Sequence, residues 1–323
     1  MTTPNQINPP RNSQRQRGAA ILIMTLILML GLITLFTFRM DRKAPELEAD
    51  RKTAMALVQA KEALLGNSAT NGIATATTEN PGRLPCPDLD NDGDSEGAVC
   101  ASYVGRLPWK TLGMDDLRDG SNEGLWYVLD AGFFDNGTPM NSAAISTIPP
   151  YNPALDVNGN KVVAVIIAPG PPLGGLNQQR DTANQNNRTN YLESYGSPTT
   201  INLNPSSPNY NDRIISITAG ELFNVVTQRM VREFVKKLAE NGLDSPYYPS
   251  TYPIMARRTV ISPPGVPLKP SDTWFDNQWD ATVSYSPTPS SNPTQFTLLF
   301  TSCTSAFTVV RNAGSNSISG KCQ

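Results

Sequence analysis

The sequence contains no histidine, and this absence removes several classes of catalytic and metal site at once. A Ser-His-Asp or Cys-His catalytic pair, a His-ligated zinc and a His-ligated haem each need an imidazole. No S-x-x-K motif is present to support other nucleophilic chemistry. We therefore expect a protein that is not an enzyme.

Charge is also scarce. The 323 residues include 26 Lys and Arg against 28 Asp and Glu, and only 17% of residues are charged. Such a chain has no basic field to hold a phosphate backbone, so we expect no nucleic-acid partner. Hydrophobic residues make up 39% of the chain, enough for a sizeable core, and 28 prolines exceed the usual ~5%. The composition indicates a loop-rich envelope or secreted protein.

The N-terminus combines a basic stretch with a long apolar run. Residues 1–18 contain three arginines and no acidic residue, and the uncharged run Ala19–Phe38 follows directly. At ~1.5 Å per residue, this run matches the ~30 Å hydrocarbon core of a bilayer. A signal peptide would have a shorter apolar stretch and a small-residue cleavage site after it. Four downstream cysteines favour an oxidising compartment, so the pattern predicts a retained single-pass anchor with its head outside the cytoplasm.

The junction between these two stretches, Arg15-Gln16-Arg17-Gly18 followed by Ala19, resembles a prepilin-type leader. The resemblance implies that a prepilin peptidase cuts between Gly18 and Ala19 and that the new N-terminal residue is methylated. Major pilins of this kind usually carry Glu at the fifth mature position, where this chain has Ile23. In lacking that Glu, the chain resembles the K-type minor pseudopilin of type II secretion and some minor pilins of the X type.

This resemblance implies an organisation and a function. We expect a leader at 1–18, a transmembrane and stem helix at 19–66 and a periplasmic head at 67–323. The implied function is a non-catalytic minor pilin or pseudopilin, in or at the tip of a type IV pilus or type II secretion filament. It would sit in the inner membrane and contact other pilins or pseudopilins. The alternative is an unprocessed, signal-anchored envelope binding protein with a calcium-stabilised loop.

The rest of the chain predicts an α+β fold, with an antiparallel sheet and one amphipathic helix in a loop-rich head. Helix formers cover Glu46–Leu65, with a kink or a short break expected at Pro45 and a stop at Gly66. A second helix is predicted over Ala219–Ala239, because Thr218 and Glu221 have capping-box spacing. Long surface loops are expected at Gly170–Pro208 and Leu243–Pro270. Residue types and turn signals predict strands at Leu125–Leu129, Lys161–Ala168, Arg213–Thr218, Ala281–Tyr285, Gln295–Phe300 and Ala306–Val310, with Lys161–Ala168 central and buried.

A short motif occurs twice. Gly82-Arg83-Leu84-Pro85 recurs as Gly105-Arg106-Leu107-Pro108. We interpret the two copies as similar turn-plus-extended segments on either side of a common loop, because two copies are too few for a solenoid.

The intervening loop carries the strongest candidate site. Carboxylates alternate along it and Gly93 is its sixth residue, the spacing that wraps oxygens around Ca²⁺ in EF-hand-like loops. The twelfth position is Val99 instead of a bidentate Glu, so a calcium site needs another ligand, such as Asp115, Asp116 or Asp119. A solvated acidic turn is the alternative. The candidate ligands are Asp88, Asp90, Asp92, Asp94 and Glu96.

Four cysteines allow three disulfide connectivities. Pairing neighbours closes the shortest loops, and a ~15-residue loop is worth roughly 3 kcal/mol. Without a CxxC spacing, a four-cysteine zinc site is not expected. The second neighbouring pair resembles the C-terminal disulfide loop of many pilins, which implies an exposed edge that contacts a partner. The alternative is a plain staple of a loose C-terminus. The cysteines are Cys86, Cys100, Cys303 and Cys322.

One dense aromatic cluster lies in the C-terminal part of the chain. It contains Trp274, Phe275 and Trp279 within six residues. Because aromatic side chains dominate contact energetics, we expect this cluster to contact a ligand or partner.

Overall fold

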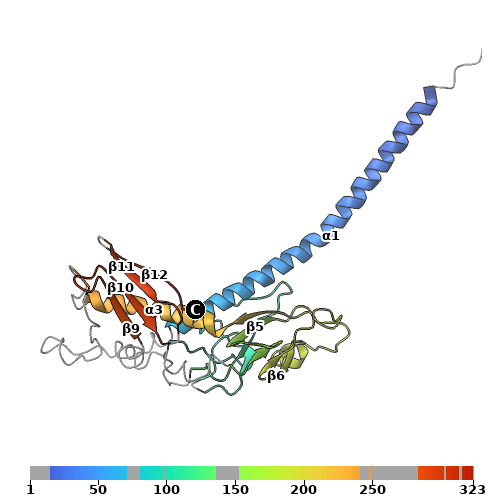
Figure 1. The fold of residues 1–323 in the computed structure, drawn as a ribbon. Coiled ribbons are helices and arrows are strands. Elements are labelled where there is room, and N and C mark those ends of the chain that lie inside the picture. The colour runs from blue at the N-terminus through green and yellow to red at the C-terminus, as the bar shows by residue number, and fades with distance from the viewer. Residues whose placement is uncertain are drawn as a thin grey trace, which may run out of the picture. The chain divides into compact units, whose positions relative to one another are not determined.

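The structure is a computed structural model (Figure 1). It describes residues 15–70, 81–97, 99–135, 153–240, 247–248, 283–301, 303–312 and 315–322, with the backbone alone at 15–19, 34–44, 237 and 240. The chain divides into two compact units, Met1–Arg51 and Lys52–Gln323. Each unit is described by itself below.

Helix α1 spans Arg15–Thr70 and includes Pro45. The predicted stop at Gly66 is therefore wrong, and at Pro45 the helix continues without a break. The last turn continues because it is packed in the second unit: Ser68 and Ala69 are buried, and the Gly82 amide donates to the Ser68 carbonyl over 2.8 Å. Such tertiary contacts outweigh the low helix propensity of a glycine.

The predicted membrane span is not found in the described part of the chain, where no helix is both long and apolar enough to cross a bilayer. The prediction of a single-pass inner-membrane protein with a periplasmic head is therefore wrong.

A four-stranded antiparallel sheet forms the centre of the second unit, in the order β1-β2-β5-β8. Successive residues of its inner strands contribute to two different cores: Ile166 belongs to one cluster, and Val165 and Ile167 belong to the other. Both faces of the sheet are thus covered, which confirms the predicted central buried strand. The strands are β1 (Val104–Arg106), β2 (Trp126–Leu129), β5 (Ala164–Ala168) and β8 (Arg213–Ile217).

Two further four-stranded sheets overturn the predicted single-sheet head. One, β4-β3-β7-β6, contains a parallel pair between β3 and β7 and is built from strands of two or three residues. Strands this short carry no alternating pattern of apolar and polar residues, so no strands were predicted from the sequence there. The other, β12-β11-β10-β9, is an antiparallel meander. The bounds are β3 (Asp156–Val157), β4 (Asn160–Lys161), β6 (Tyr195–Ser197), β7 (Thr200–Ile201), β9 (Val283–Thr288), β10 (Gln295–Phe300), β11 (Phe307–Asn312) and β12 (Ser315–Ser319).

The predicted loop Gly170–Pro208 contains more regular structure than expected. Besides β6 and β7, it holds two short 3₁₀ helices, η1 (Thr182–Asn184) and η2 (Arg188–Asn190). Each begins with a polar cap: the side chains of Asp181 and Asn187 accept a hydrogen bond from a backbone amide two or three residues on. Local side-chain capping therefore orders this segment.

Helix α3 spans Ala219–Glu240 and begins at the predicted capping box. The Thr218 amide donates to Glu221 Oε2 over 2.9 Å, and the Glu221 amide donates to Thr218 Oγ1 over 3.3 Å. Lys61 of α1 reaches the same carboxylate at 2.6 Å and also donates to the Ser216 carbonyl. The two helices are thus linked to the end of β8.

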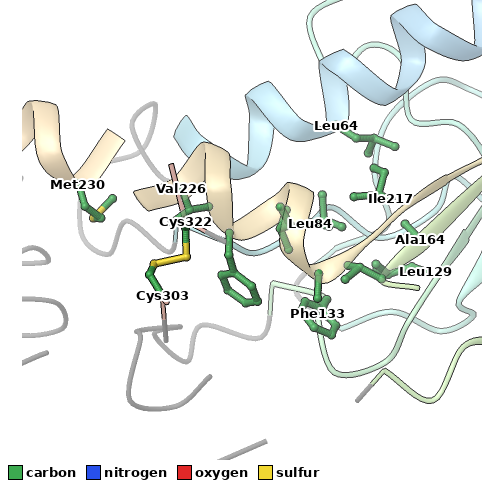
Figure 2. Packing of buried hydrophobic residues seen from close by; sticks show 14 of the residues in the cluster. Leu64, Leu84, Leu129, Phe133, Ala164, Ile217, Val226, Met230, Cys303 and Cys322 are labelled. Carbon is green, nitrogen blue, oxygen red and sulfur yellow. A yellow bond between two sulfur atoms is a disulfide. The ribbon is translucent and has the colours of Figure 1, made fainter. Parts of the chain in front are cut away.

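The larger core joins α1, α3, one face of the central sheet and the C-terminal meander (Figure 2). Leu64 of α1 lies near Ile217 of β8, while Val226 of α3 lies beside the disulfide of the C-terminal segment (Figure 2). The smaller core holds the opposite face of the central sheet against β3, β6 and β7.

Candidate functional site

The acidic loop lies between the two copies of the repeated motif and is closed by a disulfide between Cys86 and Cys100, with a Cα–Cα distance of 5.3 Å. Backbone hydrogen bonds join its start to the second copy: the Asp88 amide donates to the Arg106 carbonyl over 3.0 Å, and the Arg106 amide donates to the Asp88 carbonyl over 2.7 Å. The disulfide and this bridge hold the two ends of the loop together.

Asp88 organises the turn from its interior. Its side chain is fully buried, and its two carboxylate oxygens accept the amides of Asn91 at 2.6 Å and Gly93 at 2.7 Å. Gly93 has φ +93°, and a Cβ placed there would meet the Trp109 indole at 2.5 Å. Glycine is therefore needed for both the backbone conformation and the close approach of the ring.

Burial raises the pKa of Asp88, and the neighbouring carboxylates Asp90 and Asp92 add to that effect. The two backbone amides act in the opposite direction by stabilising the anion. A cation bound beside Asp88 would stabilise the ionised carboxylate in the same way as these amides do. The electrostatics of this position are therefore compatible with Asp88 as a metal ligand.

Three of the five predicted metal ligands converge. One oxygen from each of Asp88, Asp90 and Glu96 lies within 4.8 Å of the others. Two oxygens on opposite sides of a Ca²⁺ ion are about 4.6–5.2 Å apart, so this spacing fits one coordination sphere. Calcium takes six to eight oxygens, and backbone carbonyls or water would have to supply the remainder.

The other predicted ligands have different roles. Asp92 accepts the Asp94 amide, and Asp94 lies 3.8 Å from Lys110 Nζ. Asp116 pairs with Arg118 at 2.5 Å. Asp119 is buried and accepts the amides of Ser121, Glu123 and Gly170. Neither these residues nor the exposed Asp115 belongs to the three-carboxylate group.

The second disulfide joins Cys303 and Cys322 with a Cα–Cα distance of 4.8 Å, so the structure has neighbour pairing at both ends of the second unit. The Cys322 amide donates to Asn224 Oδ1 of α3 over 3.2 Å. This disulfide therefore fastens the C-terminal segment to α3. Whether the segment contacts a partner stays a prediction.

Two other predicted features have limited structural description. Gly18 and Ala19 lie in α1, where only their backbone is described. Trp274, Phe275 and Trp279 lie outside the described residues.

Sequence reasoning missed the burial of several charged groups, among them Arg106 and Asp212. Arg106 is 5% exposed and lies in the second motif copy, where only the repeat itself drew attention. Asp212 is 6% exposed, and burial followed by the neighbouring Glu193 raises its pKa to about 7. Neither residue carries a sequence signal for burial, because both lie in segments without an alternating apolar pattern.

Comparison with known proteins gives no relative: no family model, no curated protein and no solved structure matches this chain.

Proposed function

We propose that this chain is a non-catalytic minor pilin-like or pseudopilin-like subunit, assembled into or at the tip of a type IV pilus or type II secretion filament. The observation that carries the proposal is that apolar side chains of α1 are exposed in one part of the helix and buried in another. In the first unit, the large apolar side chains of α1 between Ile21 and Ile33 are 54–72% exposed. In the second unit, Ala56, Leu57, Ala60 and Leu64 of the same helix are buried in the core.

A helix that is anchored in a core at one end and apolar at the other suits assembly. Exposed apolar runs of this length need a cover in water, and the equivalent helices of neighbouring subunits would supply one. The basic residues and Gly18 directly before the apolar run support the same proposal, because they match a leader that is removed before assembly.

The N-terminus of the protein in its native host tests this function. We expect the mature chain to begin at Ala19 with one added methyl group, measured by intact mass and N-terminal peptide mapping. Gly18→Val should block processing and remove the chain from sheared filaments. Gly31→Val is the matched control: Gly31 lies in the same apolar stretch, and an added Cβ there meets no atom within 4 Å. Residues 1–18 remaining on the native protein would contradict the proposal.

A second candidate is an envelope binding protein whose acidic loop is stabilised by Ca²⁺. The convergence of Asp88, Asp90 and Glu96 favours it. The carboxylates would hold the ion and fix the loop between the two motif copies. No catalytic step is required of them.

The melting temperature of the protein, measured in calcium and in EDTA, tests whether the acidic loop binds Ca²⁺. Saturation at 100 times Kd adds about 2.7 kcal/mol to the stability of the folded state. We expect a calcium-dependent rise for the unmodified protein and for Asp115→Asn, which changes an exposed carboxylate outside the group. The rise should be lost in the double variant Asp90→Asn, Glu96→Gln. A melting temperature of the unmodified protein that does not respond to calcium would rule the ion out.

A further inference from the structure

A small polar cavity of about 220 Å³ lies beside the acidic loop in the second unit. Three separate segments form its walls. They contribute Arg106 at the end of β1, then Arg118, Glu123 and Gly124 in the following turn, and Arg180, Asp181, Thr182, Gln185 and Tyr191 in the segment that contains η1. Asn91 of the acidic loop completes the lining, and its side-chain amide donates to Gln185 Oε1 over 3.2 Å. The cavity has room for about seven water molecules at ~30 Å³ each.

Arg106 is the most buried cation of this cavity. Its guanidinium carbon lies 4.2 Å from the ring centre of Trp126 and 4.3 Å from that of Tyr191, so two aromatic rings hold it. One terminal nitrogen donates to the Gly124 carbonyl over 3.0 Å, and the other donates to the Gln185 carbonyl. Its Nε is buried without a hydrogen-bond partner. The rings and carbonyls fix the guanidinium plane while leaving donors unused.

The carboxylates near the cavity are committed to other groups. Glu123 lies 3.4 Å from Arg180, whose side chain is only 4% exposed and also stacks on Tyr191 at 4.6 Å. Asp181 is exposed and accepts the Asn184 amide as the cap of η1. Among the described residues, no carboxylate lies within ion-pair distance of Arg106.

The buried guanidinium groups of Arg106 and Arg180 therefore both stack on the ring of Tyr191, and Glu123 is the one carboxylate that pairs with either of them among the described residues. A buried cation without a counter-charge is costly, and a second cation nearby increases that cost. Burial lowers the pKa of Arg106, and Arg180 acts in the same direction, while Tyr191 and Glu123 raise it. An arginine nevertheless stays protonated in proteins, so the positive charge persists.

We propose that this cavity binds a small oxyanion, a carboxylate or phosphate group, whose charge balances that of Arg106. A guanidinium presents a planar set of donors that matches both anions. The hydroxyl of Thr182 and the side-chain amide of Gln185 border the same space and supply neutral donors. The size limits the occupant to a single phosphate or one acidic sugar ring.

The binding test uses the full chain after metal is removed with EDTA and the EDTA is then dialysed away into a carboxylate-free buffer, so that the acidic loop is free of metal and no chelator competes. Sodium phosphate and sodium D-glucuronate are the probes, and sodium chloride at equal ionic strength and neutral glucose are the controls. Isothermal titration calorimetry measures affinity, and the fluorescence of the chain reports on Trp126 beside Arg106. We expect at least one oxyanion to bind the unmodified protein, and the tighter probe identifies phosphate or carboxylate as the group.

Variants locate the site. Arg106→Met should weaken binding at least tenfold, and Arg106→Lys several-fold, because an ammonium keeps the charge but not the planar donors. Arg188→Met is the matched control, since Arg188 is exposed, stacks on Tyr195 at 4.9 Å and does not line the cavity. Binding of neither oxyanion to the unmodified protein overturns the proposal whatever the variants do. Equal affinity in the unmodified protein, Arg106→Lys and a folded Arg106→Met would do the same. The outcome is independent of N-terminal processing and therefore of the proposed function.

Discussion

The two copies of the Gly-Arg-Leu-Pro motif place the same residue types in opposite surroundings. Arg83 is 7% exposed and donates to the carbonyls of Gly132 at 2.8 Å and Phe134 at 3.3 Å, with the charge of Asp135 nearby. Arg106 is equally buried and also donates to two carbonyls, but it lines a cavity, and the favourable charge of Glu123 is opposed there by the charge of Arg180. The charges opposite a buried arginine, and not the motif, therefore decide whether it fastens the fold or offers a binding site.

The glycines of the two copies are also needed for different reasons. Gly82 has φ +95°, in the region that favours glycine. Gly105 needs glycine for space: a Cβ there would lie 2.4 Å from the Asp88 carbonyl oxygen and 2.9 Å from Pro87 Cβ. One copy uses the backbone freedom of glycine, and the other uses its missing side chain.

The largest expected effect comes from substituting these glycines. Gly105→Ala should lower the free energy of unfolding by roughly 3 kcal/mol, because a backbone atom cannot move aside cheaply. Gly82→Ala should cost about 1–2 kcal/mol for its positive φ. Equilibrium urea unfolding measures both values.

Substitution by asparagine distinguishes the need for a positive φ at Gly82 from the need for space at Gly105. Because Asn tolerates positive φ better than Ala, Gly82→Asn should cost less than Gly82→Ala. At Gly105 the order should reverse, since a larger side chain worsens the clash. The same order of Ala and Asn at both positions would refute the distinction.

An intermediate effect is expected from removing each arginine. Arg83→Met should cost about 2–3 kcal/mol, because it leaves the carbonyls of Gly132 and Phe134 without their donor and removes the positive charge near Asp135. Arg106→Met should cost about 1 kcal/mol or less, since the lost hydrogen bonds and ring stacking are offset by removal of an uncompensated buried charge. Urea unfolding in a buffer without phosphate or carboxylate gives both values. Equal losses would show that Arg106 is as structural as Arg83.

Much of the regular structure could be predicted from local pattern. The six predicted strands correspond to β2, β5, β8, β9, β10 and β11, and α3 begins where its capping box predicts. The acidic loop was found from its spacing, although only three of its five carboxylates converge. Each of these features is encoded within about ten residues of sequence.

The features that depend on distant residues were not predictable. The parallel pairing of Asp156 with Thr200 joins two-residue strands more than 40 residues apart, and no residue pattern marks either strand. The continuation of α1 beyond Gly66 depends on contacts with Gly82 and Arg229. The cavity needs three segments that only the fold brings together, so Arg106 could not be distinguished from Arg83 in the sequence.

Asp212 supplies the opposite case to Arg106, a buried acid without a cation, and it is expected to give the smallest effect. Its Oδ2 accepts the Ser194 amide at 2.7 Å, while its Oδ1 is buried without a partner. Burial, followed by the charge of Glu193, raises its pKa to about 7. A raised carboxyl pKa means that the folded state holds the proton more tightly than the unfolded state. Stability should therefore fall as pH rises from about 4 to about 7.

Asp212→Asn should remove this pH dependence. Asn keeps an acceptor for the Ser194 amide and carries no charge, so the variant should match the parent near pH 4 and exceed it at pH 8. The expected gain at pH 8 is roughly 1–2 kcal/mol, because the buried amide still lacks part of its hydrogen bonding. Urea unfolding at both pH values measures it, with Asp115→Asn as a control that changes an exposed carboxylate of the same unit. A variant that is less stable than the parent by the same amount at pH 4 and pH 8 would show that Asp212 is ionised throughout, and that a buried acid without a cation, unlike Arg106, is balanced by its surroundings.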